Sequence, residues 1–134
     1  MKSAVNLVIG LACLSLASGC ATIDTMRAQE TYSGIERRFT VSHEQALKAS
    51  QQVLTQMGLK VRDTYRIDDS ASAIIAYQEM NAVSCGVLVR VVVQSLSESE
   101  TAVRIITRRK IATNIFAEND FSQPFFWNLQ GKLR

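Results

Sequence analysis

Residues 42–58 read SHEQALKASQQVLTQMG and predict an amphipathic α-helix. Ser42 is followed three positions later by Gln45, the spacing of a capping box, in which two otherwise unpaired backbone N–H groups are satisfied reciprocally. Apolar and small residues recur at intervals of three and four along one stripe: Ala46, Leu47, Ser50, Val53, Leu54 and Met57. Gly58 stands where a helix commonly ends in the left-handed conformation. The polar remainder predicts a helix that lies against a sheet with its other side in water.

The segments around this helix alternate between apolar and polar residues, a pattern that predicts strands. These segments are 36–41, 59–67, 71–77, 86–96 and 101–109. Polar links such as residues 68–70 and 97–100 favour antiparallel pairing of the last four strands. A final helix is expected from Asp120 or Ser122, with Pro124 in its first turn and Gly131 at its end. The resulting order, β-α-β-β-β-β-α, predicts an α+β domain of two layers, with a mostly antiparallel sheet and one amphipathic helix packed on one face.

The N-terminus carries a pattern of charge, apolar run and small residues that predicts an export signal. Lys2 supplies the charge, residues 5–16 are mainly apolar, and residues 16–20 read LASGC. The apolar run is too short for a membrane span, which takes about 20 residues. We therefore expect residues 1–19 to be a signal peptide. An ordinary secretory signal, with Cys20 placed by chance, is the alternative.

The LASGC ending resembles the lipobox of bacterial lipoprotein precursors. The resemblance implies cleavage before Cys20, a diacylglyceryl group on its thiol and an acyl group on the new amine. These lipids would hold the chain in the bilayer, since two or more acyl chains anchor stably at about 0.8 kcal/mol per buried CH₂. Ala21, rather than Asp, implies the outer membrane. Residues 20–35 are then expected to be the lipidated cysteine and a tether, and residues 36–134 a periplasmic α+β domain.

Most of residues 36–109 resembles small Gram-negative envelope lipoproteins of unassigned function. The resemblance rests on Phe39 with Val41, Ala46 with Ala49, GLKV at 58–61 and TAVRI at 101–105. The chain departs from that group because it lacks a glycine-rich segment after the cysteine and has an aromatic C-terminal end. The pattern is also similar to the domains of the lipoprotein accessory subunit of the outer-membrane β-barrel assembly machine. That similarity supports the fold more than the function.

Composition and motifs indicate a protein that is not an enzyme. Without residues 1–19 the formal charge is +2, too small to favour a nucleic-acid partner. One histidine and scattered glycines build no metal site or phosphate-binding loop, so we expect no cofactor beyond the lipid on Cys20 and identify no small-molecule ligand. A nucleophilic Cys85 paired with His43 is the one enzymatic alternative. The alternative is that Cys85 is a small buried hydrophobic residue and His43 a solvated residue of the first helical turn.

Two charged groups have both a functional and a structural interpretation. Asp68 and Asp69 could act as a carboxylate pair, but adjacent positions in a polar link are more typical of a turn. The run 108–110, RRK, could contact lipid phosphates, although a solvated strand end explains three charges equally well.

The C-terminal segment is unusually rich in apolar residues. We identify four of them as candidate partner-binding residues: Phe125, Phe126, Trp127 and Leu129. They could instead be core, because apolar stripes on helices usually are. The sequence thus predicts a lipid-anchored, periplasm-facing outer-membrane lipoprotein that acts as a non-enzymatic interaction or structural module, with an envelope protein as candidate partner. The alternatives are an accessory subunit of an envelope assembly or secretion machine and a Cys85-dependent enzyme.

Overall fold

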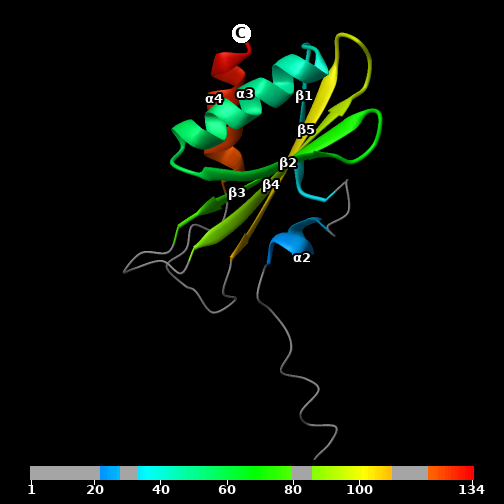
Figure 1. Cartoon of the computed structure of the whole chain (residues 1–134). Coiled ribbons are helices and arrows are strands. Elements are labelled where there is room, and N and C mark those ends of the chain that lie inside the picture. Colours follow the sequence, from blue (N-terminus) through cyan, green and yellow to red (C-terminus); the bar gives the residue numbers. More distant parts are fainter. Residues whose placement is uncertain (1–21, 28–32, 80–85, 110–120) are drawn as a thin grey trace, which may run out of the picture.

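The computed structural model describes residues 22–27, 33–79, 86–109 and 121–134. Its strands are β1 (Ile35–Phe39), β2 (Lys60–Arg66), β3 (Ala71–Gln78), β4 (Val87–Ser95) and β5 (Thr101–Arg109), and its helices are α2 (Ile23–Arg27), α3 (His43–Gln56) and α4 (Ser122–Lys132). All strand pairs are antiparallel, in the order β1-β5-β4-β3-β2 (Figure 1). The predicted two-layer α+β class, with its antiparallel sheet, is confirmed.

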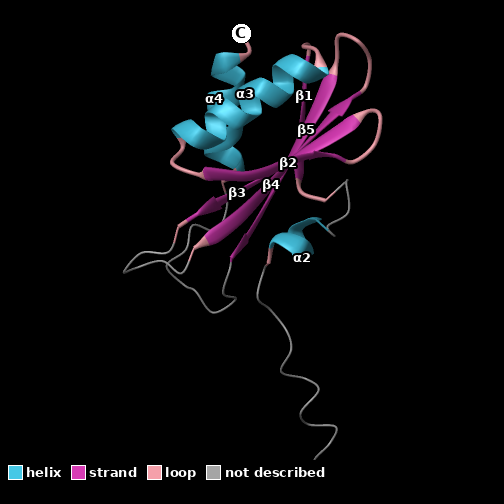
Figure 2. Ribbon diagram, in the orientation of Figure 1, coloured by secondary structure: helices cyan, strands magenta, loops and turns pink. Residues whose placement is uncertain are grey.

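Helices α3 and α4 cover one face of the sheet and bury the main core (Figure 2). From β4, Val87, Val89, Val91 and Val93 contribute to this core, as the alternation of the sequence predicts. The intervening side chains of β4 are buried as well, among them Leu88 at 2% exposure. The sheet is therefore covered on both faces in its centre.

The start and end of α3 follow the predicted pattern. Ser42 Oγ accepts a hydrogen bond from the Gln45 backbone N–H at 3.3 Å, and Gln45 Oε1 accepts one from the Ser42 N–H at 3.2 Å. Gly58 follows the last turn with a φ of +83°. Of the predicted stripe, Ala46, Ser50, Val53 and Leu54 are buried and Leu47 and Met57 are partly buried. The helix thus packs on the sheet with the face that its sequence indicates.

Helix α2 lies within residues 20–35, the range predicted to hold the lipidated cysteine and a tether. Met26 is 1% exposed and packs with Ile75 and Leu88 on the sheet face opposite α3 and α4. Ile23, one turn earlier, packs against the same cluster. Two apolar residues three positions apart are too few to show a helical period, so the sequence gives a weak signal here, and docking to the sheet supplies the stability that so short a helix lacks.

Strand β1 lies at the edge of the sheet beside β5, a pairing that the sequence does not predict. Gly34, just before β1, has a φ of +100°, and a Cβ there would collide with the carbonyl oxygen of Ile105. The absence of a side chain at Gly34 therefore permits the close approach at which β1 begins to pair with β5.

Helix α4 forms where the sequence predicts a final helix, but its ends differ in detail. Phe121 is the residue before the helix, and its side chain makes no capping hydrogen bond. Gly131, expected to end the helix, lies inside its last turn, and the helix continues to Lys132. Gly131 has no positive φ, so the left-handed termination that glycine favours does not occur there.

Candidate functional site: the exposed side of helix α4

The structure divides the four candidate partner-binding residues between core and surface. Phe125, Phe126 and Leu129 are 0%, 1% and 0% exposed and belong to the main core. Trp127 is 79% exposed. Successive residues lie about 100° apart around a helix, so Trp127 points away from the side that Phe125, Phe126 and Leu129 share. Partner binding by the three buried residues would require the domain to open, and Trp127 alone of the four is accessible.

Aromatic and polar contacts fix α4 on the sheet. The rings of Phe125 and Phe126 meet edge to face, with centroids 5.3 Å apart. The ring centroid of Phe39, in β1, lies 6.4 Å from that of Phe126. The guanidinium of Arg37 lies 5.1 Å from the centre of the Phe126 ring, within the range of a cation–π contact. The Phe121 backbone N–H donates to Thr107 Oγ1 of β5 at 3.3 Å. The indole of Trp127 is therefore presented from a rigid support.

Polar side chains line two hollows at the exposed side of α4, and one of the hollows includes the indole. A hollow of about 140 Å³ is lined by Trp127, Gln130, Gly131 and Arg134. A second hollow, of about 400 Å³, lies between α3 and the end of α4 and is lined by Gln51, Gln52, Thr55, Gln56 and Lys132. An aromatic side chain with a polar and cationic rim has the composition of a small protein-binding site. We call Trp127, Gln130, Gly131 and Arg134 the Trp127 surface.

Both edges of the sheet carry features that oppose the addition of another strand. The edge strand β1 has the charged run Glu36, Arg37 and Arg38. The register of β2 against β3 shifts between Val61 and Asp63, which marks a bulge. Charges and bulges are common protections of edge strands. The sheet edges are thus poorer candidates for a partner site than the Trp127 surface.

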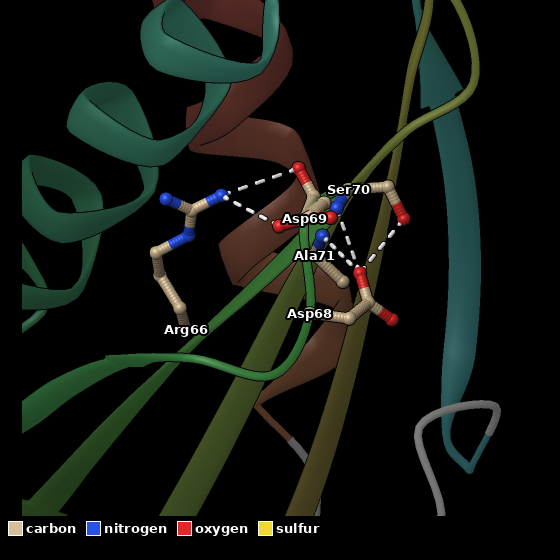
Figure 3. A network of polar contacts seen from close by, with 5 residues as sticks. All are labelled: Arg66, Asp68, Asp69, Ser70 and Ala71. Carbon is tan, nitrogen blue, oxygen red and sulfur yellow. Dashed lines mark hydrogen bonds and ion pairs between the residues drawn. The ribbon is translucent and has the colours of Figure 1, made fainter.

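The Asp68 carboxylate organises the turn between β2 and β3 (Figure 3). Asp68 Oδ1 accepts hydrogen bonds from the Ser70 N–H at 2.7 Å, the Ser70 hydroxyl at 2.9 Å and the Ala71 N–H at 2.9 Å. The hydrogen bond from the Ser70 backbone, followed by that from its side chain, lowers the pKa of Asp68. Asp69 points elsewhere and approaches Arg66 at 3.7 Å. The geometry favours the turn interpretation over a catalytic carboxylate pair.

The other sequence-derived candidates are only partly described. Cys20, Cys85 and Lys110 lie outside the described residues, so lipidation and the Cys85–His43 pairing stay predictions. His43 is the first residue of α3, and its Nε2 atom is buried without a hydrogen-bond partner in the described part of the chain. Arg108 is exposed, and its Nη1 donates to the Thr107 carbonyl at 3.4 Å.

The described residues contain neither a metal-binding cluster nor a membrane-spanning helix. Within residues 22–27, 33–79, 86–109 and 121–134, no group of three His, Cys, Asp or Glu side chains is arranged to hold a metal ion. None of the helices in these ranges is long and apolar enough to cross a membrane. No protein-family model matches the chain, and no curated protein matches it.

Proposed function

We propose that this chain is a lipoprotein of the outer membrane whose periplasmic α+β domain is a non-enzymatic protein-interaction module. The LASGC ending of the predicted signal supports lipidation at Cys20. The lipids tether the domain to the membrane for its lifetime. One acyl chain binds a membrane reversibly, whereas several together bind it stably. A domain tethered in this way would hold another envelope component near the membrane.

The exposure of Trp127 is the observation that carries the interaction role. Every other aromatic ring of α4 is buried, so the helix does not need the indole for its own packing. A tryptophan exposes a large apolar area, and it is among the side chains most often responsible for binding energy at protein interfaces. Arg134, which lines the same hollow as Trp127, would complement an acidic rim on the partner. We therefore expect a protein partner with an apolar pocket edged by carboxylates.

Co-purification of the detergent-extracted protein tests this role. The Trp127→Ala variant should lose its partner while it keeps the unfolding midpoint of the native chain, because truncation of an exposed side chain usually changes stability by less than about 0.5 kcal/mol. Leu96→Ala is the matched control, since Leu96 is also a large exposed apolar residue, at 40%, but lies beyond the end of β4. A partner retained by Trp127→Ala, or lost equally in both variants, would contradict the proposal.

Mass spectrometry of the extracted chain tests the anchor separately. We expect a mature chain that begins at Cys20 and carries the mass of a diacylglyceryl group and one further acyl chain. The Cys20→Ser variant should not carry either lipid and should leave the membrane fraction, because the anchor is then missing. An unmodified Cys20 in the native chain would refute the lipoprotein assignment.

A further inference from the structure

Helix α2 is attached firmly to the sheet face opposite α4. Its first turn is closed by Thr22 and Thr25: the Thr22 N–H donates to Thr25 Oγ1 at 2.7 Å, and the Thr25 N–H donates to Thr22 Oγ1 at 3.2 Å. Met26 is buried at 1% exposure. Arg27 forms an ion pair with Asp63 of β2, and its guanidinium lies 5.4 Å from the centre of the Tyr65 ring. Residues 22–27 are thus fixed to the domain.

We propose that the sheet face that carries α2 lies against the phosphate headgroups of the bilayer, with Arg62 in contact with them and the Trp127 surface directed away from the membrane. This inference rests on the proposed lipidation of Cys20. Only Ala21 and Thr22 separate Cys20 from Ile23. Three residue steps span at most about 10 Å, and the headgroup layer of one leaflet is about 5–8 Å thick. A lipid on Cys20 therefore brings α2 to the membrane surface.

The side chains beside α2 have the chemistry that this contact needs. A hollow of about 520 Å³ is lined by Ile23, Asp24, Arg27, Arg62 and Asp63. Arg27 is already paired with Asp63. Arg62 is exposed, lies at the bulge of β2, and forms no ion pair with any residue of the described ranges. A guanidinium binds phosphate oxygens through several N–H groups, so Arg62 is the group that would receive a lipid phosphate.

The opposite layer is held away from the same membrane. Helix α4 packs on the other face of the sheet, as the separate cores under α2 and under α3 and α4 show (Figure 1). Packed layers are about 10 Å apart, so the sheet and the thickness of α4 lie between the headgroups and the indole of Trp127. This orientation leaves the Trp127 surface open to a partner in the periplasm.

Distance from the headgroups can be measured on the lipidated mature chain, which begins at Cys20, in phosphatidylglycerol vesicles. Nitroxide labels are placed at Asp24→Cys in α2 or Gln130→Cys in α4, both exposed positions, in a Cys85→Ser background. A lipid that carries a paramagnetic chelate on its headgroup should shorten the relaxation time of the label at position 24 strongly and of that at position 130 hardly at all. A headgroup-linked quencher should likewise leave the fluorescence of Trp127, the one tryptophan of the chain, unchanged.

Charge reversal tests the role of Arg62. Arg62→Glu should weaken the relaxation effect at position 24, whereas Lys132→Glu, an equal change of charge at the end of α4, should leave it unchanged. Equal relaxation at positions 24 and 130, or an Arg62→Glu variant that behaves like Lys132→Glu, would overturn this inference while the lipid anchor stands. A native chain with an unmodified Cys20 that does not float with the vesicles would overturn the proposed function and this inference with it.

Discussion

At Asp68 a single carboxylate oxygen replaces the backbone partner that a tight turn would otherwise need. It accepts from two successive N–H groups and from a hydroxyl, all of them uncharged donors. The sequence indicates a turn here because Asp and Ser favour this geometry. It cannot tell which of the two adjacent aspartates accepts the hydrogen bonds, since that depends on the backbone of the turn.

Acid should weaken this turn. The folded state lowers the pKa of Asp68, so the stability from its carboxylate is complete above the ordinary pKa of Asp, about 3.9, and is lost as the pH falls through the lowered value. Asp68→Asn keeps an acceptor oxygen without the titration and should therefore lose less stability than the native chain below about pH 4. Asp69→Asn should retain the native pH profile, because its ion pair is exposed. Urea unfolding at a series of pH values measures the stability of both variants. The same dependence of stability on pH in Asp68→Asn and in the native chain would contradict the expectation.

Substitution by Ala should lower the stability of the fold at one glycine, Gly34, and raise it at another, Gly131. Gly34→Ala places a Cβ against the Ile105 carbonyl at a φ of +100°, and a strained backbone of this kind costs about 1–3 kcal/mol before the collision is counted. Gly131→Ala meets nothing within 4 Å inside a helix and should stabilise by about 0.4–1 kcal/mol. Chemical denaturation gives both values. A neutral Gly34→Ala would mean that the start of β1 can move away from β5.

Among the elements, α3 is the one whose stability the sequence specifies most completely. Both halves of its capping box form. Ser42→Ala should lower the free energy of unfolding by about 1 kcal/mol, because it leaves an N–H of the first turn without its partner. Gln45→Ala should cost less, since the N–H of Ser42 lies at the exposed start of the helix and can bind water. Urea denaturation of the two variants checks this order, and a larger loss for Gln45→Ala would reverse the assignment.

The limits of the sequence are clearest where an element depends on its neighbours. Alternation predicts β2, β3, β4 and β5 as a run of neighbouring strands, and the structure pairs them so. The place of β1 beside β5 depends on a contact between residues about 70 positions apart, such as Ile35 with Ile105, which no local pattern records. Within the candidate site, the helical period of α4 could have separated Trp127 from Phe125, Phe126 and Leu129. Only the position of the sheet shows which side is buried.

At the scale of the whole molecule, the covering of both sheet faces makes α2 part of the folded domain. Met26→Ala should lower the free energy of unfolding by about 2–5 kcal/mol, the usual cost of truncating a fully buried Met. Asp24→Ala, an exposed neighbour on α2, should change it by less than about 0.5 kcal/mol.

The denaturant dependence of the Met26→Ala variant then shows how the domain is held together. If α2 unfolds together with the sheet, the urea concentration at the midpoint of unfolding falls. The slope of the free energy of unfolding against urea concentration then stays that of the native chain. If α2 detaches first, the slope also falls, because less surface is left to expose in the main transition. We expect the first outcome, since Met26 packs with Ile75 and Leu88 from the centre of the sheet. A native stability in Met26→Ala would show instead that α2 is only an appendage, and the short connection from Cys20 would then not orient the domain.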